Sequence, residues 1–416
     1  MTTKTNIQAG YKDSSVGVIP QEWEVKRIKD ICNIDADSLT ARTSPDYEFE
    51  YISLSDVDGD SFDITTSHQI FKYAPSRARR IVKKGDVVIS TVRPNLQGFF
   101  LVKDDKKDLV VSTGFSVLTP ICCDSQYLLS CFFSSIIGKQ FYSLVVGSNY
   151  PAVNSSDVAK LKLPIPPIEE QRKIAEILSV WDEAIEKQCR LIERLEERKR
   201  ALMQRLLTGR MRIHGFNTPW QKVKLGEICK RVIRRNEENC QNVMTISAQR
   251  GFVSQTDFFN KSVASSILDN YYLVLKNEFC YNKSYSNGYP MGAIKRLKET
   301  EKAVVTTLYI CFSVADSKRL NINFFEQYCE YGGLNRGLSK VANEGGRAHG
   351  LLNVTPSDFF GLKLLLPSNE EQKAIAEVLT TADDEIATHR KKLDALRLQK
   401  RGLMQQLLTG KTRVKV

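Results

Sequence analysis

Four short stretches of the sequence gather basic side chains beside asparagine, glutamine, tyrosine or glycine. They span residues 71–84, 90–98, 281–298 and 334–350. Arginine and lysine bind phosphate groups, and arginine, asparagine and glutamine can also pair with base edges in the major groove of a duplex. Glycine in the fourth stretch lets a backbone approach a duplex closely. These stretches therefore predict contacts with nucleic acid.

The candidate contact residues fall in two regions of the chain. In the first region they are Arg77, Arg79, Arg80, Lys83, Lys84, Arg93, Asn95 and Gln97. In the second region they are Lys283, Tyr285, Asn287, Arg336, Lys340, Arg347 and His349. The whole chain carries 60 Lys+Arg against 48 Asp+Glu, an excess that suits a polyanion, nucleic acid before a membrane surface. For any single residue, the alternative is an ordinary solvated surface charge.

The sequence lacks the motifs of the common enzyme classes. No G-x-G-x-x-G opens a helix after a strand, and neither a nucleophile elbow nor an Asn/Asp-Pro-Pro-aromatic tetrapeptide occurs. The segment "LLTGKT" at 407–412 approaches a P-loop, but Gln405 stands where that motif needs its first glycine. We therefore expect no catalytic residue in this chain.

Cysteine and histidine spacing gives no sign of a metal site. The ten cysteines form no C-x-x-C pair, and the four histidines, at 68, 214, 349 and 389, lie far apart. No apolar run of about 18 residues occurs, and no apolar leader follows Met1. We expect a reduced, cytoplasmic protein that binds no metal and no cofactor of its own.

Two charged segments repeat each other 201 residues apart. Residues 169–209 and 370–410 are identical at 19 of 41 positions, beginning with "EEQ" and ending with "LLTG". Fainter similarity links 20–32 with 218–229 and 153–166 with 353–367. The chain is thus predicted to contain two tandem halves, each a region of about 150 residues followed by a charged segment.

Each charged segment is predicted to be one long helix. Proline precedes each "EEQ" and is absent from the rest of the segment, while Gly209 and Gly410 provide natural helix ends. Apolar residues step by three and four, which predicts a coiled-coil seam. The seam residues are Leu178, Trp181, Ile185, Gln188, Ile192, Leu195, Lys199, Leu202, Leu379, Ile386, His389, Leu393, Leu396, Lys400 and Leu403.

Equivalent positions of the seam are polar in both copies. Gln188 corresponds to His389, and Lys199 corresponds to Lys400. Polar seam residues lower stability but fix the register and orientation of the partner helix. We expect the two helices to pair with each other, antiparallel rather than parallel, and a helix of about 40 residues would be about 60 Å long.

The regions before the two helices, 13–163 and 215–366, are predicted to be mixed and strand-rich. Strand-like runs lie at 86–92, 98–102, 108–113, 115–118, 242–247, 271–275, 303–314 and 361–366, and helices are expected at 124–141 and 321–333. The two regions share little identity, although their elements follow a similar order. The helical frame is therefore repeated closely, whereas the regions that it carries have diverged.

Together these residues resemble the specificity subunit of Type I restriction–modification systems. The resemblance is strongest in "LPIPPIEEQRKIAEIL…LMQRLLTG" and "LLLPSNEEQKAIAEVL…LMQQLLTG". It extends to "GVIPQEWEVKRIKDI", "GDVVISTVRPN", "STGFSVL" and "YNKSYSNGYPMGAIKRL", and covers essentially the whole chain.

The resemblance implies an α+β architecture with a pseudo-twofold internal repeat. Two target-recognition domains, 1–163 and 211–366, would be separated by two helical regions, 164–210 and 367–416, packed as an antiparallel coiled coil. Each domain would read one half of a split double-stranded DNA sequence. The coil would space the domains and dock two methyltransferase subunits, which restriction/translocase subunits join.

The resemblance also implies that chemistry belongs to the partner subunits. S-adenosylmethionine, and ATP with Mg²⁺, would bind there, and this chain would be a non-catalytic recognition subunit. The alternative from the residues alone is a coiled-coil scaffold or adaptor that binds another polyanion without reading sequence.

Overall fold

The computed structural model describes residues 9–57, 64–105, 108–145, 152–255, 268–344 and 352–415. The chain divides into two compact units, each described by itself below. Unit 1 contains Met1–Ile192 and His389–Val416, and unit 2 contains Glu193–Thr388. The long helices α5 (Ile168–Leu206) and α11 (Asn369–Leu407) each contribute one part to each unit.

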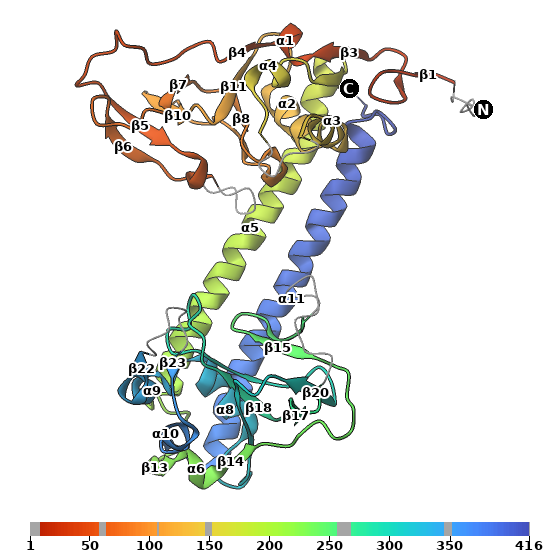
Figure 1. Ribbon diagram of the computed structural model, residues 1–416. Coiled ribbons are helices and arrows are strands. Elements are labelled where there is room, and N and C mark those ends of the chain that lie inside the picture. Colours follow the sequence, from red (N-terminus) through yellow and green to blue (C-terminus); the bar gives the residue numbers. More distant parts are fainter. Residues whose placement is uncertain are drawn as a thin grey trace. The chain divides into compact units, whose positions relative to one another are not determined.

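Unit 1 is built on two four-stranded sheets, ordered β6-β5-β10-β7 and β4-β11-β8-β9, with two-stranded sheets β1-β2 and β3-β12 beside them (Figure 1). The strands are β1 (Tyr11–Lys12), β2 (Ile19–Pro20), β3 (Glu24–Arg27), β4 (Cys32–Ile34), β5 (Glu48–Ile52), β6 (Ser67–Ile70), β7 (Ala78–Val82), β8 (Val87–Ser90), β9 (Phe99–Leu101), β10 (Leu109–Ser112), β11 (Phe115–Pro120) and β12 (Lys162–Ile165). The helices before α5 are α1 (Ile28–Ile31), η1 (Leu54–Asp56), η2 (Pro94–Leu96), α2 (Ser125–Phe132), α3 (Ser135–Val145) and α4 (Ser155–Val158).

Unit 2 repeats this plan in a reduced form. Its four-stranded sheet is ordered β14-β21-β18-β19, and two-stranded sheets β13-β24, β15-β16, β17-β20 and β22-β23 accompany it. The strands are β13 (Gln221–Lys224), β14 (Cys229–Val232), β15 (Met244–Ser247), β16 (Gly251–Ser254), β17 (Tyr272–Leu275), β18 (Phe279–Asn282), β19 (Ala293–Arg296), β20 (Lys302–Val305), β21 (Ile310–Val314), β22 (Asn343–Glu344), β23 (Leu352–Asn353) and β24 (Lys363–Leu366). Its helices before α11 are α6 (Leu225–Ile228), α8 (Ile322–Glu330), α9 (Asn335–Val341) and α10 (Pro356–Phe360).

The sheet order β4-β11-β8-β9 of unit 1 matches the order β14-β21-β18-β19 of unit 2. In each unit, a two-stranded antiparallel sheet (β3 with β12, β13 with β24) joins the start of the region to the strand that leads into the long helix. The predicted α+β class with an internal repeat is confirmed.

Two sequence predictions were wrong in detail. The run 303–314 is not one strand but β20 and β21, separated by a turn in which the Tyr309 N–H donates to the Thr306 carbonyl at 3.3 Å. The expected helix 124–141 is divided into α2 and α3 at Phe133–Ser134, where the Ser134 hydroxyl donates to the Cys131 carbonyl at 2.5 Å. In both places local hydrogen bonds close a turn that hydrophobicity alone does not reveal.

None of the predicted seam residues is exposed in the structure. Leu178, Ile185, Gln188, Ile192, Leu195, Leu379, Ile386 and Leu393 are buried, and the others are partly buried. Leu178 belongs to the hydrophobic core of unit 1, and Leu379 belongs to that of unit 2. The first turns of each helix therefore also serve as core of the adjoining region.

Within unit 1, the start of α5 lies against the end of α11. Lys400 forms an ion pair with Asp182, and the Gln188 amide donates to His389 Nδ1 at 2.8 Å and to the His389 carbonyl at 3.0 Å. Position 182 on one helix thus meets position 400 on the other, so the sequence numbers run in opposite directions. The expected antiparallel pairing is confirmed.

Within unit 2, the same contact recurs at repeat-equivalent positions. Lys199 Nζ lies 2.5 Å from Asp383 Oδ1, and Arg198 forms an ion pair with Glu385. The polar seam lysines predicted from the sequence are thus paired with aspartates on the facing helix. Such pairs favour one register over others because a shift leaves a partly buried charge without its partner.

The second glutamate of each "EEQ" is a buried carboxylate held by an arginine. In unit 1, Arg413 donates from Nε and Nη2 to the two oxygens of Glu170 at 2.7 and 3.0 Å, and the Trp23 indole N–H donates at 3.0 Å. In unit 2, Arg212 donates in the same way to Glu371 at 2.5 and 2.7 Å. Glu170 is 2% exposed and Glu371 is fully buried. We call these two interactions the arginine forks.

The glutamine of each "EEQ" is also buried and connects the long helix to a short one. Gln171 accepts from the backbone N–H of Asp124, the residue before α2, and donates to the Pro166 carbonyl. Gln372 accepts from the Asn321 N–H, the residue before α8, and donates to the Pro367 carbonyl. The glutamine of each motif thus connects the long helix to the strand-rich region that precedes it.

Replacing Arg413 with methionine should lower the free energy of unfolding of unit 1 by about 1–3 kcal/mol, because a buried carboxylate would lose its charged donor. Urea or thermal denaturation measures this loss. Lys411→Met, at an exposed position of the same tail, is the matched control and should change stability by less than about 0.5 kcal/mol. Equal stability of the two variants would show that the fork does not hold the unit together.

Candidate functional site

The same loop of the repeated sheet carries predicted contact residues in both units. In unit 1 the loop joins β8 to β9 and contains Arg93, Asn95 and Gln97. In unit 2 the loop joins β18 to β19 and contains Lys283, Tyr285 and Asn287. The strand pairs β8-β9 and β18-β19 occupy equivalent places in their sheets. The predicted contact residues of the two regions therefore lie on equivalent loops.

The β8–β9 loop has an unusual backbone. Arg93 and Gln97 both adopt left-handed conformations, with φ of 50° and 53°, on either side of η2. Non-glycine residues at positive φ are strained and concentrate at binding sites. This backbone exposes Arg93, Asn95 and Gln97, together with the apolar side chain of Leu96.

Hydroxyl groups hold the base of the β8–β9 loop. The Ser90 hydroxyl donates to the Val92 carbonyl at 2.7 Å, and the Thr91 hydroxyl donates to the Gly114 carbonyl at 2.8 Å. The base of the loop is therefore fixed, and the polar side chains at its tip are exposed.

The β18–β19 loop depends on glycine. Gly288 and Gly292 have φ of 80° and 74°, and a Cβ at Gly292 would lie 2.3 Å from the Asn282 carbonyl oxygen. Tyr285 is 62% exposed and Asn287 is exposed, whereas Lys283 is partly buried. Burial lowers the pKa of the Lys283 ammonium. The uncharged side chains thus lie at the tip and the lysine at the base.

The basic stretch 71–84 contains residues of two kinds. Arg77 and Lys84 are exposed, and Lys83, also exposed, forms an ion pair with Asp37 at 2.5 Å. The guanidinium of Arg79 lies over the Phe71 ring at 4.9 Å. These four side chains can therefore bind a polyanion without a rearrangement of the fold.

Arg80 differs because its guanidinium is bound internally. It forms an ion pair with Asp35, donates to the Phe115 carbonyl and donates to the Ser155 hydroxyl at 3.2 Å. Burial lowers its pKa, against the opposing effect of Asp35. Its position indicates a role in joining β7 to β11 and α4 rather than a free phosphate contact.

In the fourth stretch, the structure describes only part of the predicted set. Arg336 and Lys340 are exposed on α9. Arg347 and His349 lie outside the described residues.

A polar groove next to the β18–β19 loop was missed from the sequence. Its volume is about 320 Å³, and its lining includes the uncharged polar residues Thr245, Ser247, Gln249, Asn282, Ser284, Ser286, Thr306 and Tyr309. Gln249 donates to the Asn287 carbonyl at 3.1 Å, which joins the groove to the loop tip. These residues come from three separate segments, so no spacing in the sequence signals the groove.

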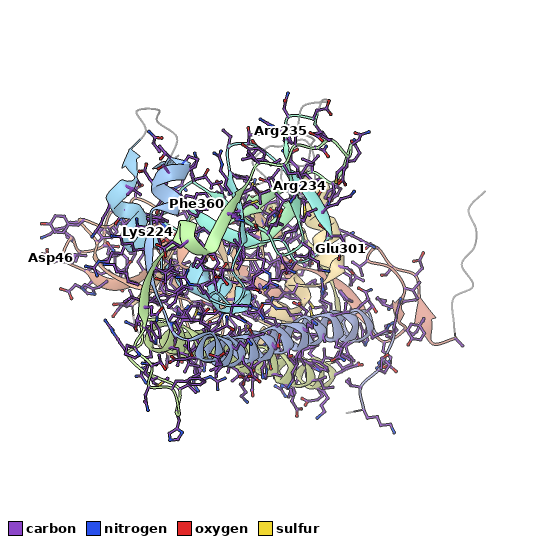
Figure 2. All side chains as sticks on the ribbon, turned by 90° about the horizontal axis from the view of Figure 1, so that it is seen from below. Asp46, Lys224, Arg234, Arg235, Glu301 and Phe360 are labelled. Atoms are coloured by element: carbon purple, nitrogen blue, oxygen red, sulfur yellow. The ribbon has the colours of Figure 1, made fainter. Side chains whose placement is uncertain are left out.

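Two further basic residues, Arg234 and Arg235, are labelled in Figure 2. Arg234 donates to both oxygens of Glu278 at 3.2 Å, and Arg235 lies 5.2 Å from the Tyr272 ring centre. Both side chains therefore have contacts within unit 2.

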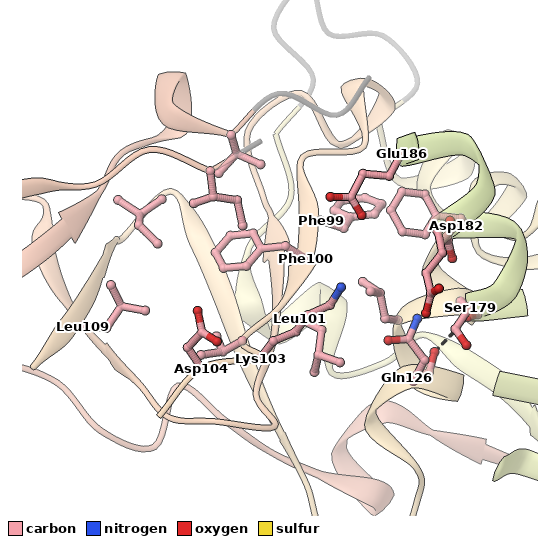
Figure 3. A pocket seen from close by; sticks show the side chains of 18 of the residues that line it. Phe99, Phe100, Leu101, Lys103, Asp104, Leu109, Gln126, Ser179, Asp182 and Glu186 are labelled. Carbon is pink, nitrogen blue, oxygen red and sulfur yellow. Dashed lines mark hydrogen bonds between the residues drawn. The ribbon is translucent and has the colours of Figure 1, made fainter. Parts of the chain in front are cut away.

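Unit 1 also contains a pocket of about 330 Å³ with a mixed lining (Figure 3). Phe99, Phe100 and Leu101 contribute apolar surface, and Asp182 and Glu186 contribute carboxylates from α5. Carboxylates repel phosphate, so this pocket does not belong to the candidate contact surface.

Among the described residues, no group of three or more His, Cys, Asp or Glu side chains is arranged to hold a metal ion. All ten cysteines are free thiols. In the described ranges, no helix is long and apolar enough to cross a membrane.

Comparisons with known proteins agree with this architecture. The family model "Type I restriction modification DNA specificity domain" matches twice, at residues 20–197 and 217–398. The chain is 26% identical to the type I restriction enzyme MjaX specificity subunit of Methanocaldococcus jannaschii, over 98% of both chains. It is also 26% identical to the MjaVIII specificity subunit of that organism, over 50% of each chain.

Two solved structures share the fold over nearly the whole chain. One comes from a study of complex assembly and conformational transition in a type I R-M system, with a TM-score of 0.58, 20% identity and coverage of 95% of this chain and 99% of that one. The other is the Type-I restriction-modification system S subunit from M. genitalium, with a TM-score of 0.55, 16% identity and coverage of 98% and 99%. With both family matches spanning most of the sequence, the chain belongs to the DNA specificity subunits of Type I restriction–modification systems, which recognise DNA and are not catalytic.

Proposed function

We propose that each unit reads one half of a split double-stranded DNA target through its β8–β9 or β18–β19 loop. The observation that carries this proposal is the equivalent placement of the two loops on the repeated sheet. Their side chains differ, with Arg93, Asn95 and Gln97 in one loop and Tyr285 and Asn287 in the other. Such side chains can form hydrogen bonds with base edges, and different side chains would select different bases.

The exposed cations would bind the phosphate backbone. Arg77, Lys83 and Lys84 would serve unit 1, and Arg336 and Lys340 would serve unit 2. Phosphate contacts fix the position of a protein on DNA without reading sequence. Arg347 and His349 stay predicted contacts of unit 2.

The long helices would set the spacing of the half-sites. A helix of 39 residues, at about 1.5 Å per residue, is about 58 Å long. At about 3.4 Å per base pair, that length corresponds to at most about 17 base pairs. A fixed, unread spacer between two half-sites follows from such a frame.

The repeated helices would also bind two copies of one partner. "EEQ" and its arginine fork recur in both units, so each unit offers a similar helix start to a methyltransferase subunit. Restriction/translocase subunits would join that assembly. S-adenosylmethionine, and ATP with Mg²⁺, would bind to those partners, in the cytoplasm.

Competition binding tests the proposal. The full chain, assembled with its methyltransferase subunits, should bind its methylation target more tightly than duplexes of altered sequence, and binding should weaken steeply with salt as counterions are released. Equal affinity for every duplex would instead support the alternative, a coiled-coil adaptor for polyanions.

Asn95→Ala and Asn287→Ala should relax recognition at different half-sites. Loss of an amide that pairs with a base edge costs about 1–3 kcal/mol of discrimination. Affinities for duplexes with one substituted base pair, measured in each half-site, report the effect. Lys187→Ala on α5, exposed and 3.5 Å from Glu183, should leave both half-sites unchanged. If both asparagine variants lost discrimination at the same half-site, the proposal that each unit reads its own half-site would be contradicted.

Lengthening both helices together should lengthen the spacer. Seven residues inserted between Gln188 and Cys189, and seven between Thr388 and His389, add one heptad to each helix and about 10 Å to the coil. Methylation mapping should then show the same half-sites with a spacer longer by about three base pairs. Insertion into α5 alone should lower stability, since the seams no longer match. An unchanged spacer in the double insertion would contradict the coil as a ruler.

A further inference from the structure

The β18–β19 loop is connected to the rest of unit 2 by three side chains that contact one another. Lys295 Nζ on β19 lies 2.5 Å from Glu330 Oε1 at the end of α8. The Tyr289 hydroxyl, from the loop, donates to Glu330 Oε2 at 2.8 Å and accepts from Lys295 Nζ at 3.1 Å. We call this closed triangle the loop clamp.

The lysine of the loop clamp is buried, and its tyrosine and glutamate are partly buried. Lys295 is only 7% exposed, and its ammonium group is 4.6 Å from the centre of the Tyr289 ring. Burial, followed by the nearby Glu330 carboxylate, raises the pKa of the Tyr289 phenol, so the hydroxyl keeps its proton and remains a donor. The Tyr289 hydroxyl can therefore donate to Glu330 while it accepts from Lys295.

Buried ionic networks are a poor means of stabilising a fold. The desolvation of the charges offsets most of their attraction, and apolar side chains of similar volume often give equal or greater stability. Such a network instead favours one defined geometry, because each charge finds a hydrogen-bond or ion-pair partner in few positions.

Tyr289 is the residue at which the loop turns back. Its N–H donates to the Ser286 carbonyl at 2.8 Å, and its carbonyl accepts from the Gly292 N–H at 3.2 Å. Of the exposed candidate readers, Asn287 lies within this turn and Tyr285 directly precedes it. Fixing the Tyr289 ring therefore fixes the direction in which the reader side chains leave the loop.

The equivalent loop of unit 1 is held by different means. Hydroxyl groups of Ser90 and Thr91 bond to backbone carbonyls at its base, and the strained residues Arg93 and Gln97 shape its tip. The clamp residues thus lie outside the two helical segments that repeat closely, and the loop of unit 1 is held without such a triangle among its described contacts.

We propose that Tyr289, Glu330 and Lys295 are positioning residues that set the base specificity of unit 2 by orienting the β18–β19 loop. This inference rests on the proposed function, since it requires that the loop read DNA. The clamp residues themselves need not touch a base.

Two conservative variants of the full chain, assembled with its methyltransferase subunits, test the proposal. Tyr289→Phe keeps the ring and removes the hydroxyl, and Glu330→Gln keeps the shape and removes the charge. Each should reduce discrimination against substituted base pairs about tenfold in one half-site, within the range of a lost base contact, and leave the other half-site and the salt dependence unchanged. The readout is the ratio of methylation rates on matched and singly substituted duplexes.

Glu326→Gln is the matched control. Glu326 lies one turn earlier on α8 and pairs with Arg296 and Lys298, outside the loop. It should change discrimination less than twofold.

A double variant, Lys295→Met with Glu330→Leu, separates positioning from stability. Because both charges are replaced by apolar side chains, the melting temperature should be close to that of the unaltered chain. Discrimination at the half-site read by unit 2 should nevertheless stay low. Recovery of discrimination together with the melting temperature would overturn the inference, because the clamp would then act only through stability. Unchanged discrimination in both conservative variants would also overturn it, and the proposed function would stand. Absence of sequence preference in the unaltered chain would overturn both.

Discussion

The rest of the fold depends on one interaction that occurs in both units. A buried carboxylate at the start of one long helix is bound by an arginine that follows the other long helix. Glu170 would be costly to bury alone, and Arg413 reaches it because α11 ends where α5 begins. Glu371 and Arg212 repeat the arrangement in unit 2. Antiparallel pairing of the helices is therefore a condition of satisfying both charges.

The helical frame is repeated between the two units, whereas the β8–β9 and β18–β19 loops are not. Residues that hold the frame, such as Asp182 and Lys400, have counterparts in Asp383 and Lys199 and form the same contacts. Residues in the loops do not correspond, and even the means of holding the loops differ. The helical frame is thus the same in both units, whereas the loops that it carries differ in their residues and in the contacts that hold them.

The sequence predicted the elements better than it predicted the roles of single residues. The two long helices, their seam positions and most strands follow from local periodicity, and these predictions agree with the structure. The sequence predicts Arg80 as a DNA contact, whereas the structure pairs it with Asp35, which is 45 residues away and outside any local pattern. The clamp and the polar groove likewise join distant segments. The arginine forks could have been found, because Arg212 and Arg413 recur at the same 201-residue offset as Glu170 and Glu371.

The claim that one unit reads one half-site is tested most directly by exchange. Residues 211–366 would be replaced with the corresponding region of another specificity subunit, and methylated sites would be mapped in the DNA of cells that carry the hybrid with its partner subunits. The account predicts that one half-site is replaced, while the other half-site and the spacer length are retained. A change in both half-sites, or in neither, would contradict it.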